Sequence, residues 1–235
     1  LKFQLKSTKS IFLKFLMIRW HSFLRMQIKV AKKLNSVIVV SKSSKQDIHD
    51  DFGLKKEAMK VILNGIDTEA FFPDENIKKI PFRIVTSASA DVPLKGLDYL
   101  LEAFSEVIKI FPDSTLQIIG SSKQGGHTSR KINDLNIKEK VQFNNDLSFK
   151  EVRDLYCSAD VVVIPSLYEG FGFAIGEAMA CRVPVITTSG GAIPEVIEDC
   201  GLLVSPGNSK ELEEAMIKLL PDEERKSFFA EKGFK

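Results

Sequence analysis

The sequence predicts an α/β protein built on a doubly wound parallel sheet, and two observations carry that prediction. Between Phe82 and Leu220, short and wholly apolar runs of strand length alternate with longer runs of helical character. The apolar runs show no polar alternation, which is typical of parallel strands that helices cover on both faces. Hydrophobic residues make up 44% and charged residues 27% of the chain, which excludes disordered, fibrous and disulfide-dense proteins.

The expected elements follow one another in β-α order. A strand at 36–40, a helix to about residue 51 and a strand at 60–63 come first. The larger part is expected to hold strands at 83–86, 115–119, 141–144, 161–164, 183–187 and 202–204, separated by helices at 96–110, 130–135, 149–157, 172–181 and 210–220. Because parallel sheets bind ligands beyond the carboxyl ends of their strands, we expect a site in the loops that follow the strands.

The length of 235 residues fits one complete domain and part of another. Residues 67–73 have turn chemistry and lead into a charged stretch at 74–79, which is the best candidate for a linker. We therefore expect residues 1–73 to be an incomplete domain with a connecting segment, and residues 74–235 to form the complete domain.

The first 33 residues are basic and apolar, and no acidic residue occurs before Asp47. Two interpretations fit this pattern: an amphipathic helix at an anionic membrane surface, or a helix that packs on a further domain. The apolar run is interrupted by Lys14 and is too short to span a bilayer, and no small-residue cleavage site follows it. We expect a cytoplasmic protein, with peripheral membrane contact through residues 1–33 under the first interpretation.

The remaining composition argues against several other classes of site. The net charge of +2 gives no reason to expect nucleic acid as a partner. Cys157, Cys181 and Cys200 are far apart and lack metal-ligand spacing, so we expect buried thiols in a reducing compartment and neither a metal nor a cofactor.

The most informative stretch is 164–185, in which a strand end, a glycine-bearing loop and a small-residue helix follow one another. Gly170 and Gly172 allow close approach of the backbone to a ligand, and the free amide groups at the start of the next helix can donate to phosphate oxygens. Glu169 precedes that helix and Glu177 lies within it. Because a carboxylate accepts hydrogen bonds at both oxygens, each can hold a vicinal diol. Two sugar rings joined by a diphosphate would satisfy all of these groups.

The segment resembles the Glu-x7-Glu motif of glycosyltransferase family 4, whose members are retaining enzymes with the GT-B fold of two Rossmann-like domains. The resemblance implies that the donor, a nucleoside diphosphate sugar, binds the C-terminal domain. It further implies that Glu169 contacts the hydroxyls of the transferred sugar, that Glu177 holds the ribose hydroxyls, and that the backbone from Phe171 to Phe173 contacts the sugar and the diphosphate.

Lys95 and Gly96 stand at the start of a predicted helix, where an ammonium group can neutralise a diphosphate. The family commonly places a phosphate-binding Lys there. Many members also carry an Arg about six residues earlier, where this chain has Ser89. Lys123 or Arg130 could supply that second charge, although a solvated loop charge is the simpler interpretation of each.

The resemblance extends to most of the chain, roughly from residue 20 to 220. The loop at 189–195 matches the part of the family that borders the donor site, although its glycines also suit a tight turn. Residues 39–41 and 61–73 resemble the last strand of the N-terminal, acceptor-side domain and the interdomain crossing. The residues assigned to the site are Glu169 and Lys95 as catalytic groups and, as substrate-binding groups, Glu177, Gly170, Phe171, Gly172, Phe173, Ala174, Gly190 and Gly191.

The expected function is transfer of a sugar, with retention of anomeric configuration, from a nucleoside diphosphate sugar to a hydroxyl of an unknown glycan, lipid or small-molecule acceptor. The chain corresponds mainly to the donor-binding half, so we expect it to be inactive alone. One alternative is a module that binds a nucleotide sugar without chemistry, and another is an epimerase of the same fold, which the motif favours less.

Overall fold

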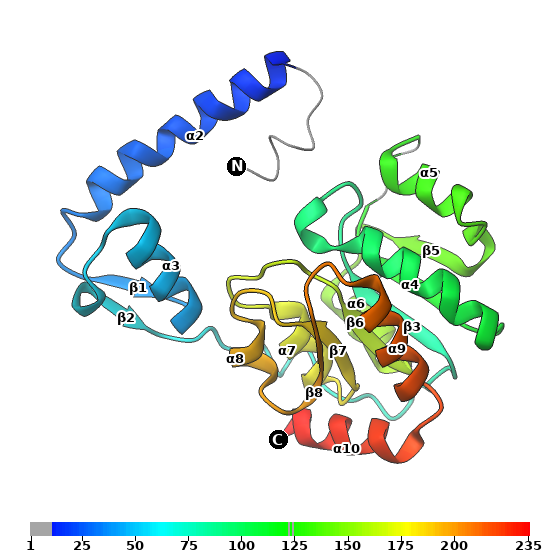
Figure 1. Ribbon diagram of the computed structural model, residues 1–235. Coiled ribbons are helices and arrows are strands. Elements are labelled where there is room, and N and C mark those ends of the chain that lie inside the picture. Colours follow the sequence, from blue (N-terminus) through cyan, green and yellow to red (C-terminus); the bar gives the residue numbers. More distant parts are fainter. Residues whose placement is uncertain (1–10, 122, 124) are drawn as a thin grey trace. The chain divides into compact units, whose positions relative to one another are not determined.

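The computed structural model describes residues 11–121, 123 and 125–235 (Figure 1). The chain divides into two compact units after Leu63. This division falls ten residues before the start of the domain expected at 74. Phe71 explains why, because it is buried with Tyr156 and Ile175 in the core of the second unit. Residues 64–73 therefore pack as part of that unit.

The first unit contains one long helix and a small βαβ motif. Helix α2 covers Ile11–Ala31, and strand β1 (Val37–Val39) runs parallel to β2 (Met59–Val61). Between them lie α3 (Lys42–Phe52) and a 3-10 turn at Lys56–Ala58. The Ser41 hydroxyl caps α3 by accepting from the Ser44 N–H at 2.9 Å. Val39, Leu54 and Met59 form the small core of this motif.

Among the residues that the structure covers, no helix is both long and apolar enough to cross a bilayer. Several large apolar side chains of α2 are exposed, among them Phe23, Met26 and Val30. Residues 1–10, which belong to the basic segment discussed above, lie outside the described residues.

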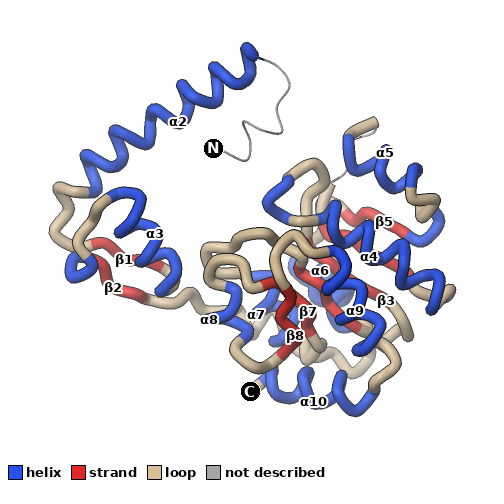
Figure 2. The backbone as a smooth tube through the Cα atoms, in the orientation of Figure 1, coloured by secondary structure: helices blue, strands red, loops and turns tan. Residues whose placement is uncertain are grey.

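The second unit is built on a six-stranded parallel sheet in the order β5-β4-β3-β6-β7-β8 (Figure 2). The strands are β3 (Arg83–Ser87), β4 (Thr115–Ile119), β5 (Val141–Asn144), β6 (Val161–Ile164), β7 (Val185–Thr188) and β8 (Gly201–Val204). The helices are α4 (Leu97–Ile110), α5 (His127–Asp134), α6 (Phe149–Ser158), α7 (Phe173–Ala180), α8 (Ile193–Ile197), α9 (Ser209–Leu219) and α10 (Glu223–Phe234), with 3-10 turns at Pro93–Lys95 and Lys138–Lys140. The predicted α/β class and parallel sheet are confirmed.

The central strands β3 and β6 each contribute side chains to two cores. Ile84, Val161 and Val163 pack into the core that contains the apolar faces of α4 and α9. Their neighbours Val85 and Val162 pack into the other core, with residues of α6, α7 and α8. Because successive side chains of a strand point to opposite faces, helices must cover both sides of the sheet. The sheet is therefore doubly wound.

Helix α10 was not among the expected elements. Asp222 caps its first turn by accepting from the Arg225 N–H at 2.9 Å. Lys226 holds the helix to the unit through a buried ion pair with Asp160, 2.6 Å long. That contact joins residues 66 positions apart, so local sequence patterns do not reveal it.

The order of the strands places a topological switch at the centre of the sheet. The chain runs outward from β3 to β4 and β5, then returns to β6 beside β3 and continues outward on the other side. At such a switch the loops that follow the two central strands diverge and leave a crevice at their carboxyl ends. Here these are the loop at 88–96 and the loop at 165–172.

Candidate donor-binding site

Lys95 and Glu169 meet at the switch point. The Lys95 Nζ lies 2.7 Å from Oε1 of Glu169, and the two side chains are 40% and 18% exposed. The Ser166 hydroxyl donates to the same carboxylate oxygen at 2.7 Å. The two residues assigned catalytic roles are thus in direct contact, 74 positions apart in the chain.

The loop after β3 reaches Glu169 because the backbone at Gly96 approaches the loop after β6 closely. Gly96 has a φ of +66°, and a Cβ there would lie 1.9 Å from the carbonyl oxygen of Pro165. Nearby, the Leu167 N–H donates to the Leu94 carbonyl at 2.8 Å. Only glycine fits these two requirements together, and the resulting turn brings Lys95 over the carboxyl ends of the central strands.

The loop after β7 completes this cluster. Glu169 forms a parallel bridge with Gly191, and its carbonyl accepts from the Ala192 N–H at 2.8 Å. Gly191 has a φ of +66°, and a Cβ there would lie 2.4 Å from the Glu169 carbonyl oxygen. The Thr188 hydroxyl donates to the Ser166 carbonyl. Three loops are therefore tied together, and the backbone of Glu169 is held by its neighbours.

Helix α7 begins directly after this cluster. Gly172 adopts a left-handed φ of +103° at its N-cap, and Phe173 and Ala174 form the first turn. The first amide groups of an α-helix have no partner within the helix, and its dipole favours anions there. Phe171 is buried while Phe173 is half-exposed, and their rings meet edge to face at 5.1 Å. The helix start thus offers backbone donors beside Glu169.

Glu177 lies farther along α7, on a cavity of about 170 Å³. Burial raises the pKa of its carboxyl, while the neighbouring Tyr156 side chain opposes that shift. Tyr156 is fully buried, and its hydroxyl makes no hydrogen bond of ordinary geometry. The half-buried Glu177 carboxylate beside the buried Tyr156 hydroxyl favours a hydroxylated ligand at this place. The cavity is lined by Gly65, Ile66, Asp67, Ala70, Phe71, Phe149, Phe173 and Glu177.

The structure brings the predicted residues together only in part. Lys95, Glu169 and Gly191 form one cluster, with the start of α7 next to it. Glu169 is not among the residues that line the cavity at Glu177, although α7 connects the two places. The roles assigned to these residues remain predictions.

Sequence reasoning missed several residues of the site. Ser166 and Tyr156 each face one of the two carboxylates, and the segment at 65–67 lines the Glu177 cavity. The sequence predicts an interdomain crossing at 61–73 and assigns none of these residues to the site. Only the tertiary packing of that segment against α7 reveals its position.

Two smaller expectations concern charge and cysteines. Ser89, Lys123 and Arg130 are all exposed, and the source of a second phosphate-binding charge stays a prediction. Cys157 and Cys181 are buried as expected, whereas Cys200 is only partly buried, so the expectation is wrong for that residue. Within the described part of the chain, no cluster of His, Cys, Asp and Glu could hold a metal ion.

Comparison with known proteins agrees with the fold and the motif. A family model described as glycosyl transferases group 1 matches residues 81–222, and one described as Glycosyltransferase Family 4 matches residues 7–70. The MMP alpha-(1->4)-mannosyltransferase of Mycolicibacterium hassiacum is 38% identical over 205 residues, which cover 86% of this chain and 49% of that protein. The chain spans about half the length of the curated relatives it matches.

Solved structures share the fold. Sucrose-phosphate synthase from Thermosynechococcus elongatus superposes with a TM-score of 0.80 at 24% identity, over 91% of this chain and 56% of that one. Anabaena Alr3699/HepE in complex with UDP-glucose also gives a TM-score of 0.80 at 24% identity, over 91% of this chain and 62% of that one. The sheet with its flanking helices is that of GT-B glycosyltransferases. The chain therefore belongs to the glycosyl transferases group 1 family, of the family 4 type.

Proposed function

We propose that this chain is the donor-binding half of a retaining glycosyltransferase and that it binds a nucleoside diphosphate sugar at the switch point of its sheet. The contact between Lys95 and Glu169, beside the start of α7, is the observation that carries the proposal. It places a cation, a carboxylate and free helix amides at the edge of the sheet where phosphate ligands bind parallel α/β proteins. The neighbour HepE, solved with UDP-glucose, supports the class of donor.

In this proposal the protein acts mainly by electrostatics. Lys95 and the first amides of α7 stabilise the charge that develops on the leaving diphosphate. Glu169 exchanges its ion pair with Lys95 for hydroxyls of the transferred sugar, and Glu177 holds the ribose with Tyr156 beside it. The acceptor hydroxyl attacks from the face on which the diphosphate leaves, so the anomeric configuration is retained. None of these roles requires a metal.

The acceptor site of the family lies in the N-terminal domain. We therefore expect residues 1–235 to bind donor and to transfer little sugar by themselves. Sugar transfer by the purified chain at rates typical of glycosyltransferases would contradict this expectation.

A thermal-shift screen of nucleoside diphosphate sugars tests the proposal. A ligand that binds only the native state raises the melting temperature by mass action. At a ligand concentration one hundred times Kd, the free energy of unfolding rises by about 2.7 kcal/mol. We expect stabilisation by at least one nucleoside diphosphate sugar and by its nucleoside diphosphate, and less by the nucleoside alone. Absence of stabilisation by any nucleoside diphosphate would argue against the site.

A nucleotide-sugar-binding module without chemistry is the second candidate, and Ser89 favours it because many relatives have an Arg at the corresponding position. Hydrolysis or transfer of the bound donor by the protein with a complete acceptor domain would exclude this candidate.

A further inference from the structure

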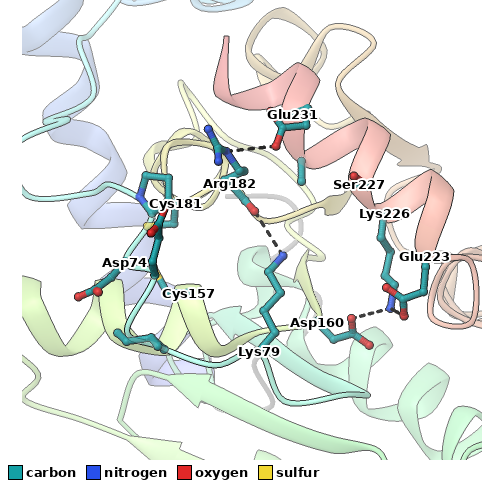
Figure 3. Close-up of a pocket in the computed structure, with 14 residues that line it drawn as sticks. Asp74, Lys79, Cys157, Asp160, Cys181, Arg182, Glu223, Lys226, Ser227 and Glu231 are labelled. Atoms are coloured by element: carbon teal, nitrogen blue, oxygen red, sulfur yellow. Dashed lines mark hydrogen bonds and ion pairs between the residues drawn. The ribbon is translucent and has the colours of Figure 1, made fainter.

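A second cavity lies at the amino ends of the strands, whereas the candidate donor site lies at their carboxyl ends. It has a volume of about 310 Å³, and its lining includes Lys79, Asp160 and Arg182, which precede β3, β6 and β7 (Figure 3). The two cavities share no lining residue, so the role proposed for the first leaves the second unexplained.

Two cysteines border this second cavity side by side. Cys157 lies in the last turn of α6, and Cys181 is the C-cap residue of α7. Both side chains belong to one buried cluster and line the same cavity, and each is near enough to shift the pKa of the other. The two side chains are 5% and 3% exposed, so the open space of the cavity is their route to small solutes.

The surroundings of Cys157 favour its thiolate. The neighbouring Cys181 thiol lowers the pKa of Cys157 to about 7, and the Asp74 N–H and the Arg153 guanidinium act in the same direction, against burial. For Cys181, the neighbouring Cys157 and burial raise the pKa. One thiol of the pair is thus prepared to act as a nucleophile, while its partner stays protonated and within reach. A low-pKa thiol next to a resolving thiol is the arrangement that oxidants convert to a disulfide.

We propose that Cys157 and Cys181 form an oxidation site at which a peroxide produces an intramolecular disulfide between α6 and α7. The Cys157 thiolate attacks one peroxide oxygen, the O–O bond breaks, and the other oxygen leaves as water or alcohol after taking up a proton. The Cys181 sulfur then attacks the resulting sulfenic acid, the S–O bond breaks, and water leaves with the Cys181 proton. The two thiols are oxidised by two electrons and the peroxide is reduced by two.

The proposed disulfide lies on the same two helices as residues of the Glu177 cavity and its neighbour Tyr156. The Cys181 N–H donates to the Glu177 carbonyl at 3.1 Å, one turn away along α7. Cys157 directly follows Tyr156, the residue beside the Glu177 carboxyl. The disulfide would therefore join the two helices that carry Tyr156 and Glu177.

The test is oxidation of the whole chain with a small molar excess of hydrogen peroxide, in a Cys200→Ser background. Dilute protein avoids bonds between molecules, and thiols are counted after an acid quench and denaturation. We expect loss of two thiols per chain, a mass loss of two hydrogen atoms, unchanged mobility as a monomer, and recovery of both thiols with dithiothreitol. Retention of both thiols, oxygen addition without a disulfide, or only intermolecular bonds would overturn the proposal.

Peptide mapping locates the bond without a variant at either cysteine. Cleavage after Glu169 and Glu177 places Cys157 and Cys181 on separate peptides, which the disulfide alone would hold together. Cys157→Ser and Cys181→Ser, each checked for folding by circular dichroism, should each abolish the two-thiol loss. Mapping that links Cys200 of the wild-type chain to either residue would contradict the pair.

Discussion

Lys95 and Glu169 form an ion pair, so a diphosphate must compete with the Glu169 carboxylate for the same ammonium group. The pair is partly exposed, and pairs of that kind contribute about 0.2–1 kcal/mol. The competition is therefore weak and reversible. It offers a way to separate the part of binding that belongs to the diphosphate from the part that belongs to the sugar.

Glu169→Gln is expected to strengthen binding of a nucleoside diphosphate about two- to fivefold, since the competing carboxylate is removed. The same variant should weaken the preference for the nucleoside diphosphate sugar over the diphosphate, because the contact with the sugar is lost. Calorimetry with both ligands measures this, and Glu106→Gln on the exposed face of α4 is the control. Weaker binding of the diphosphate alone would show that Glu169 does not compete for Lys95.

The raised pKa of Glu177 predicts how the stability of the chain depends on pH. Burial raises the pKa of this carboxyl above its ordinary value of 4.5, so the native state binds the proton more tightly than the unfolded state. The stabilisation that proton binding at Glu177 gives the native state is present at acid pH. It is lost as the pH rises through the raised pKa of the native state. Glu177→Gln should therefore raise the melting temperature more at pH 7 than at pH 4. A variant that stabilises equally at both pH values would contradict the assigned burial.

At the scale of elements, the backbone turn before α4 determines where Lys95 lies. Gly96→Ala should destabilise the chain by about 3 kcal/mol or more, because the positive φ and the approach to the Pro165 carbonyl both exclude a Cβ. Gly65→Ala is the matched control, since nothing lies within 4 Å of a Cβ there. Urea denaturation measures both variants. An equal effect of the two substitutions would mean that the turn is not as close as the structure shows.

The contacts of helix α10 include one buried charge, Lys226. Removing Lys226 leaves Asp160 buried without its ammonium partner, so Lys226→Met should cost about 3 kcal/mol. Lys210→Met, at an exposed pair on α9, is expected to leave stability almost unchanged. Denaturant midpoints compare the two, and similar values would show that the pair does not anchor the helix.

The strands and most of the helices could be predicted because their signals are local. The buried run Val161–Ile164 and the apolar face of α4 depend only on neighbouring residues. Helix α10 could not be predicted, since few of its residues are apolar and its anchor is distant in sequence. In the site, the resemblance indicated Glu169, Glu177 and Lys95, whereas the packing of 65–67 near Glu177 required the folded chain.

At the scale of the whole molecule, the described residues include two units that divide after Leu63. The second contains the complete parallel sheet, both layers of helices and every residue assigned to the donor site. Donor binding is therefore expected to be a property of residues 64–235. Because the assigned roles use only side chains and amides, EDTA should leave donor affinity unchanged in a thermal-shift assay. A loss of affinity that Mg²⁺ restores would show that a metal takes part.

The most direct measurement of the central claim is calorimetric titration of the chain and of Lys95→Ala with the nucleoside diphosphate that stabilises it most. Hydrogen bonds to charged groups contribute about 1.5–3 kcal/mol, so the account predicts a loss of affinity of about 10- to 100-fold in Lys95→Ala and no change in Lys109→Ala in the last turn of α4. Equal affinity of wild-type and Lys95→Ala would contradict a diphosphate at the switch point of the sheet.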